Sequence, residues 1–334
     1  MNRRIVLQRR PVGWVDESCF RIEACAEPEC GPEDVRLQAL YLSTDPYLRG
    51  RMNAGPSYAP GFELDRPIVS RVVARVLDSR NARFRPGDLV WGFLDWAERC
   101  VVPRGEGLHR IDPALGRASH FLSVLGMPGL TAWIGAIEIG RAAPGDTVYV
   151  SSAAGAVGQL AGQFARRAGA RVVGSAGSAA KVDFLRQRCG FDAAFDHRSV
   201  DLDEALAEHC PRGIDLYFDN VGGEIFETAL SQMKMHGRIA CCGVVSTYDT
   251  ASQPAHGPRG VPFLFVVKRL TMRGFIVSDF FGRRDAALAQ LRAWVEDGRL
   301  KVIEDVVEGF ENLPDALIGL LHGKNRGKRM VKID

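Results

Sequence analysis

Hydrophobic and polar positions follow two different patterns on either side of Pro144. Before it, short runs of β-branched and aromatic residues are separated by Gly and Pro, which predicts β-strands joined by turns. The clearest of these runs are 34–47, 66–79 and 87–93. After Pro144, short apolar runs alternate with amphipathic stretches. This alternation is typical of βαβ units around a parallel sheet.

The amphipathic stretch after the strand predicted at 147–152 has helical spacing. Its apolar residues recur at i, i+3, i+4, i+7 and i+8 and so share one helix face: Val157, Leu160, Ala161, Phe164 and Ala165. A second helix is expected to begin near Ser178, and a third to carry Phe226, Leu230 and Met233. Further strands are predicted at 170–176, 192–195, 214–222, 237–245 and 270–277. The segment 313–334 predicts one more helix and a closing strand.

Residues 151–173 contain the fingerprint of a dinucleotide site. Ala153, Gly155 and Gly158 fit GxGxxG with alanine at the first position. The motif follows a predicted strand, opens a helix and precedes a second strand, which is the context it requires. A Cβ at Gly155 would hold the backbone away from a pyrophosphate, and Gly158 lets the helix approach the strand. The N–H groups at the start of the helix favour phosphate.

The residues after the second strand predict which dinucleotide binds. Enzymes that use NAD usually carry Asp or Glu about 20 residues beyond the first motif glycine, where it binds the ribose hydroxyls. This chain has Gly174 and Gly177 in that region, followed by Ser178 and Lys181. No carboxylate would repel a 2′-phosphate there, and the serine and lysine can bind one. The predicted cofactor is therefore NADP(H).

Composition agrees with a folded protein of two domains. The chain has 334 residues, 46% of them hydrophobic and 25% charged, and a net charge of +3. One hydrophobic core seldom supports that length, and so small a charge favours neither nucleic acid nor a membrane as partner. No apolar run reaches the about 20 residues of a membrane-spanning helix, and the N-terminus lacks the apolar core of a signal peptide. We expect a cytoplasmic protein with reduced cysteines.

The cysteines and histidines lack the spacing of a zinc site. A catalytic zinc needs three ligands from Cys, His, Asp or Glu, whereas the first histidine is His109 and the cysteines before it are scattered: Cys19, Cys25, Cys30 and Cys100. We therefore predict no metal. Hydride addition to a polarised, conjugated double bond needs none, since the cofactor supplies the hydride and the protein positions the reactants.

Several motifs in order resemble the zinc-independent branch of the medium-chain dehydrogenase/reductase superfamily, and within it the prostaglandin reductase and leukotriene dehydrogenase family of NADP-dependent double-bond reductases. They lie at 42–52, 126–133, 153–165, 190–196, 217–224, 230–248 and 274–277. Zinc-dependent relatives carry a ligand cysteine where this chain has Ser43, and Gly-His-Glu where it has Gly61, Phe62 and Glu63.

The resemblance implies an α/β fold in which a GroES-like β-rich domain is joined to a Rossmann domain with a doubly wound parallel sheet. The expected boundaries are 1–124 together with 301–334 for the β-rich, substrate-binding domain, and 125–300 for the NADP-binding domain. Cofactor and substrate would meet in the cleft between them. A homodimer is also implied, joined edge to edge through the strand near 271–277.

By position, the resemblance also implies the cofactor contacts. Lys181 and the fingerprint turn should contact the phosphates through Gly155, Ala156, Val157 and Gly158. The other implied contacts are Asn220, Gly243, Val244, Val245, Ser246, Tyr248, Phe275, Ile276, Val277 and Asn325. His197 stands where the family has a tyrosine beside the 2′-phosphate. A histidine also donates to phosphate, which would make the preference for NADP depend on pH.

The catalytic hydroxyl is a second departure from the family. Members often carry a tyrosine in the strand before GFIV, near Val267 here, that can bond the substrate carbonyl. Valine cannot do so, which leaves Tyr47 and Tyr248 as candidates. Each is alternatively a packing aromatic with its hydroxyl satisfied, and the ribose hydroxyl of the cofactor is a further candidate for holding the oxygen.

The expected activity is NADPH-dependent reduction of the carbon–carbon double bond of α,β-unsaturated ketones or aldehydes, with hydride added to the β-carbon. One alternative is an NADPH-dependent quinone oxidoreductase, which would use the same fold and the same hydride. A second alternative is a protein that binds NADPH and RNA without turnover; the complete motif set argues against it.

Overall fold

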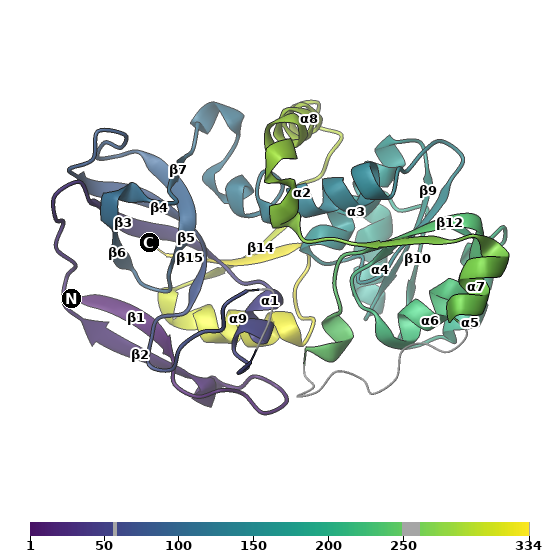
Figure 1. Ribbon diagram of the computed structural model, residues 1–334, viewed down its shortest axis with the longest axis horizontal. Helices are drawn as coiled ribbons and strands as arrows, with labels where there is room; N and C mark the ends of the chain where they lie inside the picture. The colour runs from purple at the N-terminus through teal and green to yellow at the C-terminus, as the bar shows by residue number, and fades with distance from the viewer. Residues whose placement is uncertain (56–58, 249–260, 334) are drawn as a thin grey trace.

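The computed structural model describes residues 1–55, 59–248 and 261–333. Figure 1 shows a β-rich part that contains the N-terminus and an α/β part built around a second sheet. In the described residues, no helix is both long and apolar enough to cross a membrane.

The β-rich part contains a seven-stranded sheet and a separate hairpin. The sheet has the order β14 (Glu304–Glu308), β15 (Lys328–Lys332), β3 (Val35–Ser43), β4 (Val69–Ser79), β5 (Leu89–Asp95) and β7 (His109–Arg110), with β6 (Arg99–Val102) paired to β3. The antiparallel hairpin is β1 (Asn2–Leu7) with β2 (Phe20–Cys25). Since β15 pairs antiparallel with β3, the predicted return of the tail to this part is confirmed.

The α/β part has a six-stranded parallel sheet. Its order is β10 (Ala193–Asp196), β9 (Arg171–Ala176), β8 (Thr147–Val150), β11 (Ile214–Asp219), β12 (Met233–Cys241) and β13 (Thr271–Gly274). In chain order this is 3-2-1-4-5-6, the order of a Rossmann fold. The predicted parallel sheet is therefore confirmed, and β13 is its edge strand.

Helices cover both faces of this sheet because alternate residues of each strand face opposite sides. Val148 and Val150 of β8 pack with α2 (Met127–Trp133), α3 (Ala156–Arg167), α4 (Ala179–Gln187) and α8 (Arg284–Glu296). Tyr149, between them, packs on the other side with α5 (Leu202–His209), α6 (Gly223–Ser231) and α7 (Val261–Lys268). A π-helical turn, Ile134–Ile139, extends α2.

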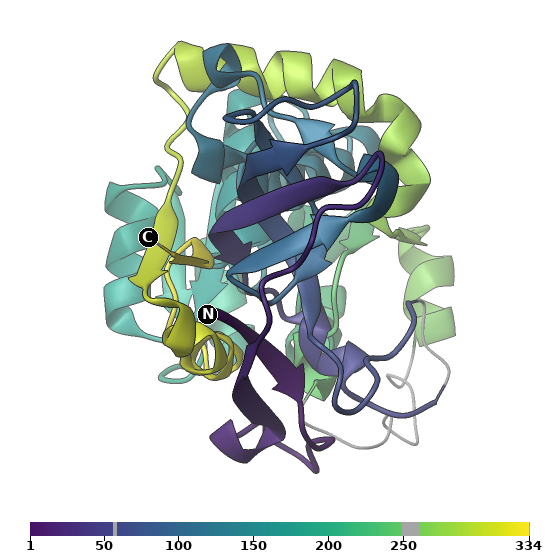
Figure 2. The same cartoon turned by 90° about the vertical axis from the view of Figure 1, so that its left-hand side faces the viewer.

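Two short helices belong to the β-rich part. α1 (Tyr47–Arg51) follows β3, and α9 (Leu313–Leu321) lies beside the β1–β2 hairpin in Figure 1 and Figure 2. Leu313 and Leu317 share a core with Ile5 and Leu7.

Several predicted elements differ from the structure. The strands predicted at 214–222, 237–245 and 270–277 end at Asp219, Cys241 and Gly274. The strand predicted at 34–47 ends at Ser43, because Pro46 adopts helical angles and starts α1. The third predicted helix ends at Ser231, and Met233 instead begins β12 with its partner Ile214. The segment around Val267 is helix α7 rather than a strand.

One of the hydrophobic clusters contains residues of both parts. The cluster around α2 and α3 also includes Val73 of β4, Trp91 of β5 and Met330 of β15. This packing fixes the sheet of the β-rich part against the carboxyl ends of the parallel strands, where ligands bind in open α/β sheets.

Candidate active site

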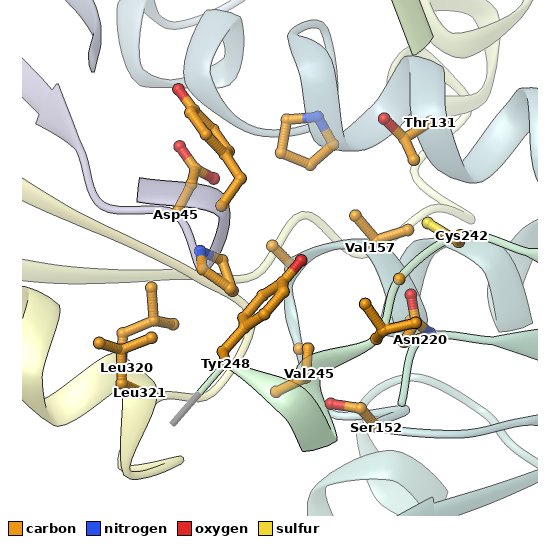
Figure 3. A pocket seen from close by; sticks show the side chains of 18 of the residues that line it. Asp45, Thr131, Ser152, Val157, Asn220, Cys242, Val245, Tyr248, Leu320 and Leu321 are labelled. Carbon is orange, nitrogen blue, oxygen red and sulfur yellow. The ribbon is translucent and has the colours of Figure 1, made fainter. Parts of the chain in front are cut away.

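A cavity of about 1340 Å³ lies where the two parts meet. Its walls come from the fingerprint turn, the ends of β11 and β12, and the segment after β13; the β-rich part adds residues 44–47 and strands β4 and β5. Figure 3 shows Asp45, Leu320 and Leu321 on one side and Val157, Asn220 and Cys242 on the other, with Tyr248 between them.

The fingerprint turn has the geometry that its glycines require. Gly155 is the N-cap of α3, and no side chain caps the first turn of that helix. A Cβ built on Gly158 would lie 2.5 Å from the Ser152 carbonyl oxygen and 2.8 Å from the Ala153 Cα, so only glycine lets α3 approach β8. Gly155, Ala156, Val157 and Gly158 all line the cavity.

Buried hydrogen bonds fix the turn that carries Asn220. The Asp219 Oδ1 accepts from the Tyr217 hydroxyl at 2.7 Å and from the Gly222 N–H at 3.0 Å. The Asn220 Nδ2 donates to the Ser151 carbonyl at 2.8 Å, which joins the end of β11 to the end of β8. Burial, and after it the Asp219 charge, raises the pKa of Tyr217 well above its ordinary value, so this phenol stays protonated.

Positive charges gather where a 2′-phosphate is expected. The Lys181 Nζ donates to the Gly323 carbonyl at 2.6 Å, and its pKa is lowered by burial and then by the charges of Arg198, Arg326 and Arg329. Arg198 is a residue that the sequence analysis missed, although it follows the predicted strand at 192–195 and the candidate His197 directly. A Cβ on Gly177 would lie 3.1 Å from the Arg198 Nε.

His197 lines the same wall, and its Nδ1 is buried without a partner among the described residues. Burial, followed by the charge of Arg198, lowers the pKa of this histidine. Ser178 occupies the N-cap position of α4 without a side-chain capping hydrogen bond, and it is not among the lining residues.

The tail segment 323–327 lies against the fingerprint turn at one side of the cavity. The Gly327 N–H donates to the Ala154 carbonyl at 2.8 Å, and the Asn325 Nδ2 donates to the Gly327 carbonyl at 2.9 Å. Gly327 has φ +70°, and a Cβ there would lie 2.4 Å from the Ile303 carbonyl oxygen. Asn325 is buried and lines the cavity beside the fingerprint turn.

The remaining candidates also line the cavity, with one exception. The lining set includes Tyr47, Asn220, Gly243, Val244, Val245, Tyr248, Phe275, Ile276 and Val277. Ser246 is outside it, because its Oγ donates to the Val221 carbonyl at 2.6 Å. Val267 is half-exposed on α7 and is also outside the cavity.

A buried ion pair lies beside Tyr47. The Lys328 Nζ is 2.5 Å from the Asp45 Oδ1 and donates to the Thr44 carbonyl at 2.8 Å. Burial lowers the pKa of Lys328, and Asp45 opposes that shift. The Ser43 hydroxyl, at the position of a zinc-binding cysteine in the zinc-dependent relatives, donates to Asp45. The described parts of the chain contain no group of three His, Cys, Asp or Glu side chains that could hold a metal ion.

Two sequence families match the chain. Residues 3–111 match the family described as the N-terminal domain of oxidoreductase. Residues 156–295 match the family described as zinc-binding dehydrogenase. The first match lies within the β-rich part, and the second contains strands β9 to β13 of the parallel sheet.

Individual relatives match over nearly the whole chain. The NADP(+)-dependent 2-alkenal reductase of Nicotiana tabacum is 40% identical, covering 99% of this chain and 97% of that protein. Prostaglandin reductase 1 of Bos taurus is 41% identical, covering 98% and 97%. The crystal structure of CurA from Vibrio vulnificus in complex with NADPH superposes with a TM-score of 0.94 at 38% identity, covering 99% of both chains. The chain therefore belongs to the medium-chain dehydrogenase/reductase superfamily, in the family of NADP-dependent prostaglandin and alkenal reductases.

Proposed function

We propose that the protein reduces the carbon–carbon double bond of α,β-unsaturated ketones and aldehydes, using NADPH and no zinc ion. One observation carries this proposal: a single cavity joins the fingerprint turn to an apolar wall that carries two phenols, Tyr47 and Tyr248. The alkenal and prostaglandin reductases among its relatives support the substrate class.

The residues present fit NADP(H). Gly155 and Gly158 leave the backbone open at the start of α3, where the N–H groups and helix dipole favour phosphate. Lys181, His197 and Arg198 provide cationic or donor groups for the 2′-phosphate. When bound, the cofactor supplies a hydride to the β-carbon of the substrate.

The protein's own contribution is to orient the substrate and to stabilise charge. Negative charge develops on the carbonyl oxygen as the β-carbon is reduced, and a hydrogen-bond donor placed there lowers the barrier by about 3 kcal/mol. We assign this role to the Tyr248 hydroxyl, with Tyr47 as the second candidate. Tyr248, or water, then protonates the α-carbon.

The absence of zinc from the mechanism is supported by the Asp45 carboxylate, which pairs with Lys328 and accepts from Ser43 instead of facing a metal. Metal analysis of the purified protein would contradict this part of the proposal if it found stoichiometric zinc.

The activity is tested by NADPH oxidation with a panel of enones, enals and simple alcohols, with product identification. A saturated ketone or aldehyde is expected. A quinone reduced to a hydroquinone, with no enone reduced, would establish the rival quinone oxidoreductase. NADPH binding without any turnover, together with RNA binding that weakens as salt is raised, would establish a non-catalytic role.

We also propose domain boundaries at 1–124 with 301–334 and at 125–300, and a homodimer joined through β13. The exposed side chain of Met272 on this edge strand supports the dimer, since an uncovered edge invites pairing. Light scattering that gives a monomer would contradict the proposed dimer.

All eight cysteines are free thiols, which supports a reducing, cytoplasmic location. Fractionation of the tagged protein in cells tests that location.

A further inference from the structure

The wall that the β-rich sheet provides contains an arginine with no role in the proposed chemistry. Arg71 of β4 lines the cavity, and only 5% of its surface is exposed. Its guanidinium carbon lies 4.9 Å from the ring centres of both Trp91 and Phe93. Aromatic faces stabilise a cation in part, but they leave the N–H donors of the guanidinium without a conventional acceptor.

No group in the described parts of the chain neutralises this cation. Arg71 forms no ion pair or side-chain hydrogen bond there, and its Nε is buried without an acceptor. Tyr47 and, after it, Asp45 are the groups that favour the charged guanidinium, and the Asp45 carboxylate is already paired with Lys328. Burial lowers the pKa of Arg71, yet an arginine stays protonated in proteins. Among the described residues, this buried positive charge therefore lacks a counter-ion.

Positive charge also acts on Arg71, since the Arg284 charge opposes the effects of Tyr47 and Asp45. Arg284 of α8 lies 5.3 Å from the centre of the Trp91 ring, and its own carboxylate partner, Asp285, is fully exposed. His109 stacks on Trp91, and burial followed by the charges of Arg284 and Arg71 lowers its pKa, which keeps it neutral at pH 7. An anionic ligand is the partner that this arrangement lacks.

We propose that Arg71 binds a carboxylate of the substrate, so that the preferred substrates are α,β-unsaturated aldehydes or ketones that carry an acidic group. This inference rests on the proposed function and narrows its substrate class. The planar guanidinium matches a carboxylate with two parallel hydrogen bonds. A neutral carbonyl would leave the charge uncompensated. Arg71 is thus a specificity-determining residue that holds the acidic end of the substrate.

The test compares acidic and neutral substrates of the same shape. The substrates are (E)-2-alkenals of increasing chain length that end in a carboxylate, each paired with its methyl ester. For the wild type, we expect kcat/KM to be at least about tenfold higher for the acid than for the ester at the best chain length. Equal values at every length would overturn the proposal.

Variants on one face of β4 provide the matched comparison. Arg71→Gln should reduce the acid-to-ester ratio by about 10- to 100-fold, mainly through KM. Arg75→Gln is the control, because Arg75 is exposed on the same strand and does not line the cavity; its ratio should equal that of the wild type. If the acid-to-ester ratio of kcat/KM in Arg71→Gln equals that of the wild type, and the variant binds NADPH normally, the proposal is overturned.

A binding measurement separates this inference from the proposed activity. With NADP⁺ present, octanoate should raise the Tm of the wild type and octanamide should not, because a ligand that binds only the native state stabilises it. Arg71→Gln should lose the octanoate effect; if that variant does not fold, Arg71→Lys replaces it and should retain part of the effect. If neither the acid nor the ester is reduced, the proposed function is refuted. If octanoate has no effect on the Tm, only the proposal that Arg71 binds a carboxylate is refuted.

Discussion

The two sides of the cavity are built in different ways. The wall that we propose binds the cofactor, called the cofactor wall below, depends on backbone geometry within short segments: Gly155 and Gly158 shape one turn, and Asp219 with Asn220 shape the next. The wall that we propose binds the substrate, called the substrate wall below, contains Asp45, Tyr47, Arg71, Tyr248 and Lys328. It depends on side chains from distant segments, since Asp45 and Lys328 are 283 residues apart. Because the cofactor wall is formed mainly by backbone, it can stay the same for any substrate that reacts with the same cofactor. The side-chain wall is where one member of the family can differ from another.

The strongest test of this comparison is Gly158→Ala. The added methyl group would meet the Ser152 carbonyl at 2.5 Å, so the turn must shift. We expect the free energy of unfolding to fall by about 3 kcal/mol and NADPH binding to weaken, measured by denaturation and by fluorescence titration. Gly282→Ala is the control, because a Cβ there meets nothing within 4 Å. Equal behaviour of the two variants would show that the turn tolerates a side chain.

On the substrate wall, Tyr248→Phe should lower kcat for enone reduction by about 100-fold, because the developing oxyanion loses a donor. The Kd of NADPH should change little. Tyr149→Phe is the matched control. The Tyr149 hydroxyl lies outside the cavity and forms a 2.8 Å hydrogen bond with the Ser175 hydroxyl. Its loss should lower the free energy of unfolding by about 1 kcal/mol, while kcat is retained. If Tyr47→Phe, and not Tyr248→Phe, lowers kcat, the role belongs to Tyr47.

At the phosphate end, Lys181→Ala should raise the Kd of NADPH about tenfold and leave that of NADH unchanged, because only NADPH carries the 2′-phosphate. The exposed Lys301→Ala serves as control. Since Lys181 also donates to Gly323, a purely structural role would weaken both cofactors equally, and isothermal titration distinguishes the two results.

The smallest expected effect is the pH dependence that His197 confers. Because its pKa lies below the ordinary value, the ring is neutral at pH 7 in the free protein. A bound 2′-phosphate favours the protonated ring, so binding takes up a proton and NADPH affinity should rise about threefold between about pH 8 and 6.5. His197→Asn should abolish the slope, and NADH should show none in either protein. A slope retained by the variant would assign it to another group.

The sequence was sufficient for the fold and for most of the residues around the fingerprint turn that line the cavity. A strand–turn–helix with glycine at positions 155 and 158 has few possible geometries, so local pattern predicts it. Lys181 was predicted because it lies just after the second strand, in the region where enzymes that use NAD carry an acidic residue for the ribose hydroxyls. Arg198 was missed because its position beside Gly177 depends on how the loop after β10 folds back.

The substrate wall could not be predicted in the same way. Arg71 and Arg75 are both arginines on the same face of β4, and the alternation along the strand does not distinguish them. Only packing of the α/β part against that sheet makes the first buried and leaves the second exposed. The prediction of a strand at 34–47 is wrong beyond Ser43 for a local reason, because Pro46 adopts helical angles and α1 begins directly after it.

The tail contacts have a consequence for biosynthesis. Gly327 bonds to Ala154 beside the fingerprint turn, and β15 pairs with β3. On the ribosome, the parallel sheet can assemble once residues up to β13 have emerged, but neither the cofactor wall nor the β-rich sheet is complete until residues 323–332 are made. A nascent chain can therefore form its parallel sheet before the tail residues that complete the cavity are available.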